Sequence, residues 1–244
     1  KKLIFKSLCK FALKGSSFII FQNKDDKFFF KKNKLMNIQT KAKIIFPLIN
    51  SKYKIKKIKS KKNKKIIFLM HCRLLFEKGI NEYFQAAKEI GKDFKDKVEF
   101  YLIGDVDLNN PSSITKFELA NWKKSNAIKI LKHKKNIHKY ILNSDVIIFP
   151  SYGEGLPSAL LEASFFGKAI ITTKVNGCKE MVKDKFNGFL IEPRNIISLK
   201  NKIEYLINNR ILIKKFGINS KKLFNKKLKK NTLNEYLQLY KKII

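Results

Sequence analysis

Cysteine is scarce in this sequence of 244 residues, which contains only Cys9, Cys72 and Cys178. Three cysteines so far apart do not make a disulfide framework or a cysteine-rich metal cluster, and such sparse use is typical of the reducing cytosol. We therefore expect no structural metal and a cytoplasmic location.

Long hydrophobic runs are also missing. No apolar stretch approaches the roughly 18–20 residues that a membrane-spanning helix needs, and the N-terminus has no signal-peptide core. The first residue is Lys rather than Met, so we expect the chain to be a fragment or a trimmed form of a longer one. At 44% hydrophobic residues, the chain carries enough apolar side chains to form a folded core.

Acidic residues and arginine are the remaining scarcities, because 19 Asp and Glu stand against 54 Lys and Arg, which gives a net charge of +35. The only arginines are Arg73, Arg194 and Arg210. Lys is spread through every segment beside abundant Asn, Ile and Phe, as AT-rich coding would produce. Peripheral contact with an anionic membrane, where each Lys adds on the order of 1 kcal/mol, stays an alternative. Unclustered Lys gives nucleic-acid binding the least support, so we expect no nucleic-acid partner.

Short apolar strands alternate with amphipathic helices from residue 65 onward. The expected strands are Ile66–His71, Val98–Ile103, Ile128–Leu131, Val146–Phe149, Ala169–Thr173 and Phe189–Ile191. This alternation predicts an α/β fold with a Rossmann-like, doubly wound parallel sheet. Ligands of such sheets bind beyond the carboxyl ends of the strands, and Arg73 and the Gly153 loop both follow strands.

The chain is expected to contain two domains. Residues 1–50 are interpreted as the end of one α/β unit and residues 66–244 as a second unit, with the last helix, about 232–242, a candidate to pack back on the N-terminal part. The expected elements of the first unit are a helix over Leu3–Leu13 and strands at Phe18–Gln22 and Ile44–Phe46. Residues 51–65 are Lys-rich without a regular period, which predicts an interdomain linker or an ordinary solvated loop.

A glycine-containing loop follows the expected strand Val146–Phe149. Gly153 and Gly155 allow close approach of a bulky anion to the backbone, and Pro157 is interpreted as the first residue of a helix. The N–H groups left without a helical partner would be those of Leu156, Ser158 and Ala159. A helix N-terminus carries roughly half a positive charge and suits a phosphate.

Charged side chains surround this anion site. Glu154 and Glu162 are poor phosphate ligands but good acceptors for sugar hydroxyls, whereas Arg73 and Lys78 could stabilise a departing diphosphate. No acidic pair with metal-ligand spacing accompanies them, so we expect no metal. The alternatives are that Arg73 and Lys78 are surface residues near a helix start, that Glu154 is a loop charge paired with a lysine, and that Glu162 is a helix-surface carboxylate.

The three histidines show no matching nucleophile or metal-ligand spacing, so we interpret all of them as structural. They are His71, His133 and His138. One of them, His71, is the last residue of an expected strand and lies two residues before Arg73.

Three motifs occur in the order known from one enzyme family. They are Arg73-Leu-Leu-Phe-Glu-Lys78-Gly79, the Ser151-Tyr-Gly-Glu-Gly-Leu-Pro157 loop with Glu162-Ala163, and Asn176-Gly-Cys-Lys-Glu180. Over about residues 60–244 the chain resembles retaining GT-B glycosyltransferases of family four (glycosyl transferases group 1). The run Asn110-Pro-Ser-Ser-Ile-Thr-Lys resembles the bacterial branch that extends lipid-linked or surface polysaccharide.

The resemblance implies a GT-B-type fold with a C-terminal donor domain and, in residues 1–50, a truncated remnant of the N-terminal acceptor domain. It implies catalytic roles for Arg73 and Lys78 on the diphosphate and for Glu154 on the donor sugar. The implied donor-binding residues are Gly153, Gly155, Leu156, Ser158 and Glu162, with Glu162 on the ribose. The 128–137 segment would border the base.

The chain also departs from the family pattern. His71-Cys72 replaces the usual small residues before Arg73, Lys132 stands where glycine is usual, and Phe46-Pro47 replaces a glycine-containing hinge segment. By this resemblance we expect this sequence to hold only the last elements of the N-terminal acceptor domain, without that domain's catalytic residues.

The function implied is transfer of a hexose or N-acetylhexosamine from a UDP-sugar to a lipid-linked or polysaccharide acceptor, with retention, without metal or cofactor, at the inner face of the plasma membrane or free in the cytoplasm. One alternative is a non-catalytic, truncated fragment that binds the UDP-sugar only. A basic nucleic-acid-binding protein is the remote alternative.

Overall fold

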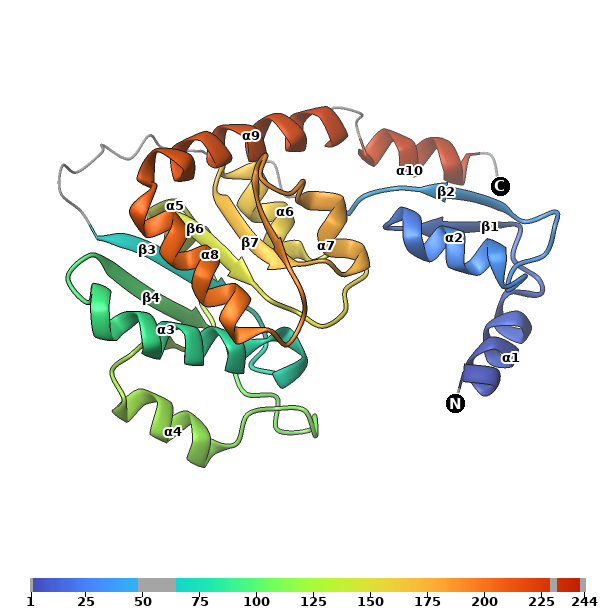
Figure 1. Cartoon of the computed structure of the whole chain (residues 1–244). Helices are drawn as coiled ribbons and strands as arrows, with labels where there is room; N and C mark the ends of the chain where they lie inside the picture. Colours follow the sequence, from blue (N-terminus) through green and yellow to red (C-terminus); the bar gives the residue numbers. More distant parts are fainter. Residues whose placement is uncertain (1, 48–64, 229–231, 242–244) are drawn as a thin grey trace. The chain divides into compact units, whose positions relative to one another are not determined.

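The computed structural model describes residues 2–47, 65–228 and 232–241 of the chain (Figure 1). The chain divides into two compact units. Unit 1 comprises residues 1–48 and 227–244, and unit 2 comprises residues 49–226. The predicted linker, 51–65, lies outside the described residues apart from Lys65.

Unit 2 is built on a six-stranded parallel sheet in the order β5-β4-β3-β6-β7-β8. The strands are β3 (Ile66–His71), β4 (Val98–Ile103), β5 (Lys129–Leu131), β6 (Val146–Phe149), β7 (Ala169–Thr173) and β8 (Gly188–Ile191). The first strand, β3, lies in the middle, and the strand order reverses beside it. The predicted doubly wound α/β sheet is therefore confirmed, with a topological switch point between β3 and β6.

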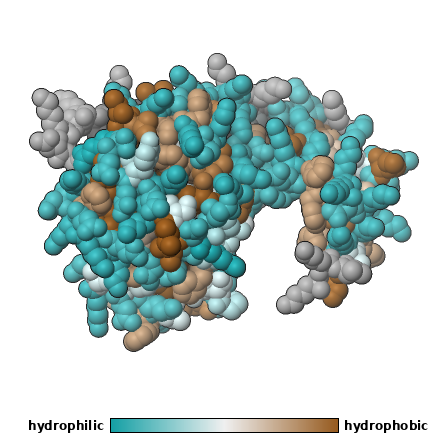
Figure 2. All heavy atoms as spheres, in the orientation of Figure 1, coloured by the Kyte–Doolittle hydropathy of each residue, from teal (hydrophilic) through white to brown (hydrophobic). Residues whose placement is uncertain are grey.

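Helices cover both faces of this sheet (Figure 1). They are the short η1 (Phe76–Lys78), α3 (Ile80–Phe94), α4 (Lys116–Lys124), α5 (Ile137–Asn143), α6 (Ser158–Phe165), α7 (Asn176–Met181), α8 (Ile196–Asn208) and α9 (Arg210–Leu228). Helices α3 and α8 pack against each other on the face turned to the viewer, and α5 and α6 lie behind the sheet. Hydrophilic side chains cover most of the visible face of unit 2 (Figure 2).

The core of unit 2 follows from its apolar periodicity. Strands β6 and β7 are buried at every position, as continuous apolar strands between two helical layers should be. Helix α3 buries a stripe that includes Tyr83, whose hydroxyl donates to the carbonyl of Phe68, 3.0 Å away. The buried phenol is thus satisfied at the strand on which the site is built.

Unit 1 contains α1 (Lys2–Leu13), β1 (Phe18–Phe21), α2 (Lys24–Lys32), β2 (Lys41–Ile44) and α10 (Thr232–Tyr240). Strands β1 and β2 are parallel neighbours. The C-terminal helix α10 belongs to this unit, where Glu235 lies 3.2 Å from Lys43 of β2. Unit 1 is therefore formed from both ends of the sequence.

One predicted strand was wrong in position. The sequence favoured Ile44–Phe46 because that triplet is apolar, but the strand is Lys41–Ile44. Its exposed lysines alternate with half-buried residues, and Ile44 pairs with Phe21, the last residue of β1. The strand ends there because its partner ends there.

Candidate active site

A pocket of about 360 Å³ lies at the switch point of the unit 2 sheet. Its lining residues are His71, Cys72, Arg73, Ile103, Gly104, Asp105, His133, Ile137, Ser158 and Glu162. They come from the ends of β3 and β4, the segment after β5, and helices α5 and α6. Three predicted site residues, Arg73, Ser158 and Glu162, thus share one cavity where ligands of such sheets bind.

The guanidinium of Arg73 is held at this pocket by a carboxylate. Arg73 Nη1 lies 3.0 Å from Asp107 Oδ2, and the Arg73 side chain is 65% exposed. Asp107 lies in the loop after β4, where its backbone N–H donates to Ser113 Oγ at 3.0 Å. An exposed pair of this kind contributes little to stability, so an incoming anion can compete for the guanidinium.

Helix α6 begins one residue later than predicted. Ser158 is its first residue, and Pro157 is the N-cap, with an extended ψ of 123°. Helical hydrogen bonding begins with the Leu160 N–H, which donates to the Pro157 carbonyl at 3.1 Å. The N–H groups of Ser158 and Ala159 precede that first bond, and Ser158 lines the pocket. The helix end that was predicted to bind an anion therefore belongs to the pocket.

Lys78 and Glu154 form a separate ion pair beside the pocket. Lys78 Nζ lies 2.7 Å from Glu154 Oε1, and their side chains are only 19% and 13% exposed. Ser151 Oγ donates to the same oxygen at 2.7 Å. Neither charged residue lines the cavity, but both act electrostatically on Cys72, which does. Burial raises the pKa of the Cys72 thiol to about 12, so the thiol is neutral at pH 7 and adds no charge to the lining of the pocket.

Two glycines position this ion pair. Gly79 has a φ of +77°, and a Cβ there would lie 2.2 Å from the carbonyl oxygen of Pro150, so only glycine lets η1 approach the loop after β6. A Cβ on Gly177 would lie 2.3 Å from the carbonyl oxygen of Gly155. The Gly177 N–H donates to Glu154 O at 3.0 Å. The loop from Ser151 to Pro157 is thus fixed between η1 and α7.

The other predicted donor-binding residues lie outside the pocket lining. A Cβ added to Gly153 would meet nothing within 4 Å, so open space adjoins that residue. Gly155 lies against Gly177, and Leu156 is buried. Sequence spacing placed these residues near the predicted anion site. It could not show which side of the loop packs against neighbouring elements and which side faces the pocket.

Glu162 and His71 face each other within the pocket. Glu162 Oε2 lies 3.9 Å from His71 Nε2. Burial raises the pKa of Glu162 to about 7 and, with a smaller effect of His138, lowers the pKa of His71 to about 4. The imidazole is therefore neutral at pH 7, and the two side chains do not form an ion pair.

Sequence reasoning did not assign His71, His133 or Asp107 to this site. Both histidines were interpreted as structural, yet they line the pocket, and Asp107 was not singled out, yet it holds Arg73. The position of His71 at the end of a strand, two residues before Arg73, was a signal that was available. Asp107 gave none, because its partner is 34 residues away in the sequence.

The sequence profile of the family "Glycosyl transferases group 1" matches residues 51–223. The chain belongs to this family.

Two relatives of this chain are named as glycosyltransferases with undecaprenol-linked substrates. It is 30% identical over 253 residues to an N,N'-diacetylbacillosaminyl-diphospho-undecaprenol alpha-1,3-N-acetylgalactosaminyltransferase of Campylobacter jejuni, covering 100% of this chain and 65% of the relative. It is 31% identical over 222 residues to a UDP-Gal:alpha-D-GlcNAc-diphosphoundecaprenol alpha-1,3-galactosyltransferase of Escherichia coli, covering 86% and 56%. The chain therefore spans between half and two thirds of the length of these relatives.

Solved structures of GT-B glycosyltransferases share the fold. TarM has a TM-score of 0.78 at 18% identity, with 97% of this chain and 45% of TarM covered. Anabaena HepE in complex with UDP has a TM-score of 0.77 at 18% identity, with 95% and 65% covered. A glycosyltransferase from Rickettsia africae has a TM-score of 0.76 at 22% identity, with 98% and 66% covered. The predicted GT-B-type fold is confirmed.

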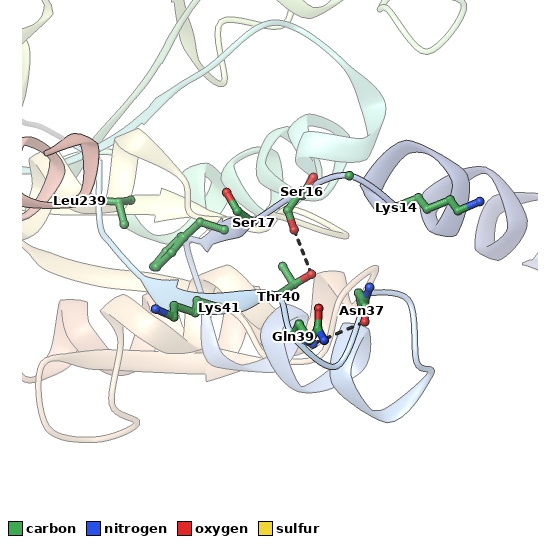
Figure 3. A pocket seen from close by; sticks show the side chains of 10 residues that line it. Lys14, Ser16, Ser17, Asn37, Gln39, Thr40, Lys41 and Leu239 are labelled. Atoms are coloured by element: carbon green, nitrogen blue, oxygen red, sulfur yellow. Dashed lines mark hydrogen bonds between the residues drawn. The ribbon is translucent and has the colours of Figure 1, made fainter. Parts of the chain in front are cut away.

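Unit 1 of this family member has a second pocket, of about 490 Å³ (Figure 3). It is lined by Lys14, Gly15, Ser16, Ser17, Phe18, Asn37, Gln39, Thr40, Lys41 and Leu239. Most of these residues lie where the chain enters β1 and β2, and the Thr40 hydroxyl donates to the Ser16 carbonyl at 3.0 Å. No predicted site residue lies there, so the donor site is sought in unit 2.

The titratable side chains of the described ranges include no group of three or more His, Cys, Asp or Glu residues suited to holding a metal ion. Independence from metal stays a prediction for this family member.

Proposed function

We propose that this protein transfers a hexose or N-acetylhexosamine from a UDP-sugar to a lipid-linked or polysaccharide acceptor, with retention and without a metal. The observation that carries the proposal is the meeting of Arg73, the start of α6 and Glu162 in one pocket at the switch point of the sheet. A cation, a helix N-terminus and a carboxylate suit the diphosphate and the ribose of one nucleotide. The C. jejuni and E. coli relatives, named for undecaprenol-linked glycans, support the acceptor class.

The diphosphate is assigned to Arg73 and the N-terminus of α6. A phosphate can displace Asp107 from the guanidinium, because the side chain is exposed and the ion pair is weak. The Ser158 N–H lies at the positive end of the helix dipole. Charge that builds on the departing diphosphate is then stabilised without reorganisation of the protein.

The donor sugar is assigned to the side of the site that holds Lys78 and Glu154. Within that buried pair, the Glu154 carboxylate can accept from sugar hydroxyls, while Lys78 supplies positive charge near the leaving group. Gly153, Gly155 and Leu156 shape the loop that carries Glu154.

In the reaction, the bond between the anomeric carbon and the diphosphate oxygen breaks. The acceptor oxygen attacks from the same face and forms the new glycosidic bond. Its proton passes to the departing phosphate oxygen, which remains bound by Arg73. This route needs no protein nucleophile. Its products are the glycosylated acceptor and UDP, which takes up the proton that the acceptor loses.

A second candidate function is binding of the UDP-sugar without transfer. The chain covers 65% and 56% of the two relatives described above. If transfer also needs residues from the parts of such a relative that this chain does not cover, the transfer site would be incomplete in this chain. Binding would then survive and turnover would be lost.

Contact with an anionic membrane is proposed as the setting of the reaction, since lipid-linked acceptors sit in membranes and the chain carries a charge of +35. None of the described helices has the length and apolar character required to cross a bilayer.

Isothermal titration calorimetry with UDP tests the site. Arg73→Ala should weaken UDP binding about tenfold to a hundredfold because it removes a charge-assisted contact, and Glu162→Ala should weaken it about tenfold. Arg210→Ala, which removes an exposed arginine of α9, is the matched control and should leave binding unchanged.

Unchanged affinity in both site variants would contradict the assignment. Transfer assays with undecaprenol-linked acceptor then separate an enzyme from a UDP-sugar-binding fragment. Salt-sensitive binding to duplex nucleic acid that is indifferent to Glu162 would favour the remote alternative instead.

A further inference from the structure

Arg194 has a left-handed backbone although it is not a glycine. Its φ is +59°, in a region that L side chains rarely adopt and that glycine adopts freely. It lies in the loop after β8, at the carboxyl edge of the sheet, and it is one of only three arginines in the chain. Backbone strain of this kind is one sign that a side chain is used at the place where it stands.

The side chain of Arg194 stacks on Tyr152, which belongs to the loop that carries Glu154. The guanidinium carbon lies 4.7 Å from the centre of the Tyr152 ring, within the range of a cation–π contact. A planar guanidinium also stacks on an aromatic face, which an ammonium group cannot do. Arg194 therefore covers one face of a ring two residues before Glu154.

Tyr152 is anchored at two other points. Its hydroxyl donates to Glu82 Oε1 at 2.6 Å, and its backbone N–H donates to the Glu77 carbonyl at 2.9 Å. Burial and the Glu82 carboxylate raise the pKa of the Tyr152 phenol, so the phenol keeps the proton that it donates. Glu82 is only 5% exposed, and its Oε2 is buried with no hydrogen-bond partner among the described residues. Loss of the Tyr152 hydroxyl would leave both carboxylate oxygens of Glu82 unpaired, so this anchor is costly to break.

The neighbours of these anchors hold the Glu154 side chain. Ser151, the residue before Tyr152, donates its hydroxyl to Glu154 Oε1 at 2.7 Å. Lys78, the residue after Glu77, places Nζ 2.7 Å from the same oxygen. Movement of Tyr152 therefore displaces both partners of Glu154, whereas the residues proposed to bind the nucleotide line the pocket and belong to other segments.

We propose that Arg194 is a positioning residue for the donor sugar: its guanidinium, stacked on Tyr152, holds the loop so that Glu154 faces the sugar hydroxyls. The inference rests on the proposed function, since it takes Glu154 as the ligand of the donor sugar. It gives a role to an arginine that lies outside the three family motifs.

Lys185 provides a matched control. Its φ is +58° and its side chain is exposed, but it lies in the turn before β8, at the other end of that strand. Glycine at this position relieves the same backbone conformation and leaves the stack between Arg194 and Tyr152 in place.

Calorimetry of the full chain with UDP, UDP-galactose and UDP-N-acetylgalactosamine tests the proposal. Arg194→Gly should weaken binding of the UDP-sugars about threefold to fivefold, the loss expected from one exposed cation–π contact, and leave the affinity for UDP within about twofold. Arg194→Lys, which keeps a cation over the ring, should retain most of the UDP-sugar affinity. Lys185→Gly should change neither affinity.

Amide hydrogen exchange of residues 151–156, measured without ligand, tests the loop directly. Arg194→Gly should speed exchange of the Tyr152 N–H about threefold to fivefold, because the loop opens more often once the stack is lost. Lys185→Gly should leave this exchange at the wild-type rate.

UDP-sugar affinity that stays at the wild-type value in Arg194→Gly would overturn the proposal. An equal loss of affinity for UDP would overturn it as well, since the variant would then disturb the fold in general, and so would unchanged exchange in the loop. Failure of the proposed function looks different, because the wild-type protein would then bind neither UDP nor the UDP-sugars. The role of Arg194 toward the sugar would fall with it, even where the exchange of the loop still depends on the stack.

Discussion

The two halves of the candidate site are built on opposite principles. Lys78 and Glu154 form a closed pair with mostly buried side chains and a supporting serine hydroxyl. On the pocket side, Arg73 is largely exposed, while Glu162 and His71 line the cavity and each has a buried polar atom without a hydrogen-bond partner among the described residues. The first group is complete without a ligand and holds the loop in place, whereas the second becomes complete when a ligand arrives.

The difference explains where stability and binding should separate. Breaking a buried pair leaves a charge without a partner, so the closed group should affect folding first. The open group carries unpaired polar atoms that favour binding at the expense of folding, so its loss should affect the ligand first. Four predictions test this contrast, ordered from the largest expected effect to the smallest.

Lys78→Met should lower the free energy of unfolding by about 3 kcal/mol, because it strands the Glu154 carboxylate in a mostly buried position. Urea unfolding followed by circular dichroism measures this change. The double variant Lys78→Met with Glu154→Gln should recover much of the loss. Lys129→Met is the matched control, since its pair with Glu99 is 57% exposed on the lysine side, and it should cost less than about 1 kcal/mol.

Glu162→Gln should remove a pH dependence of stability. The pKa of Glu162 rises from 4.5 to about 7 on folding, so the folded protein holds an extra proton between these values. Its contribution is therefore present below pH 4.5 and is lost as pH rises through 7, by at most about 3 kcal/mol. The stability of wild type relative to Glu162→Gln should fall over this range in pH-dependent urea unfolding, and a constant difference would contradict the raised pKa.

The same titration should act on the ligand in the opposite direction. The ionised carboxylate of Glu162 can accept hydroxyl hydrogen bonds on both oxygens, whereas the protonated form carries an O–H on one of them. UDP affinity should therefore increase from pH 6 to pH 8 in the wild-type protein. This rise should be absent in Glu162→Gln. Binding that improves as stability declines is the signature expected of the open group.

Asp107→Asn should have the smallest effect. It removes the carboxylate that competes with a phosphate for Arg73, so UDP affinity should rise by less than about fivefold while the free energy of unfolding stays within about 0.5 kcal/mol. Calorimetry at low and moderate salt measures this gain, which should shrink as salt increases. Weaker binding in this variant would mean that Asp107 orients Arg73 rather than competing for it.

Much of the fold was legible in the sequence because its signals are local. Continuous apolar runs predicted the six strands of unit 2, and the glycine-rich loop after Val146–Phe149 predicted the start of a helix near an anion site. The error at β2 arose where the apolar triplet Ile44–Phe46 outweighed an alternating Lys-Ala-Lys-Ile pattern. Pairing with β1, a long-range contact, decided that boundary.

The site divides in the same way. Arg73, Lys78, Glu154 and Glu162 were identified from spacing, yet spacing alone did not reveal that two of them pair with each other, 76 residues apart. It also gave no sign that Asp107 lies beside Arg73 or that Glu162 lies 3.9 Å from His71. These are contacts across different loops, and their existence depends on the order of strands in the sheet.

By itself, the sequence determined the α/β class, the position of the loop that we propose to bind an anion and the residue types that could serve a nucleotide-sugar, because these follow from hydrophobic period and local backbone chemistry. Tertiary structure alone decided which charges neutralise each other and which remain open to a ligand. The physical reason is that burial and distance set charge state and pairing, and both are fixed only when strands distant in sequence lie side by side.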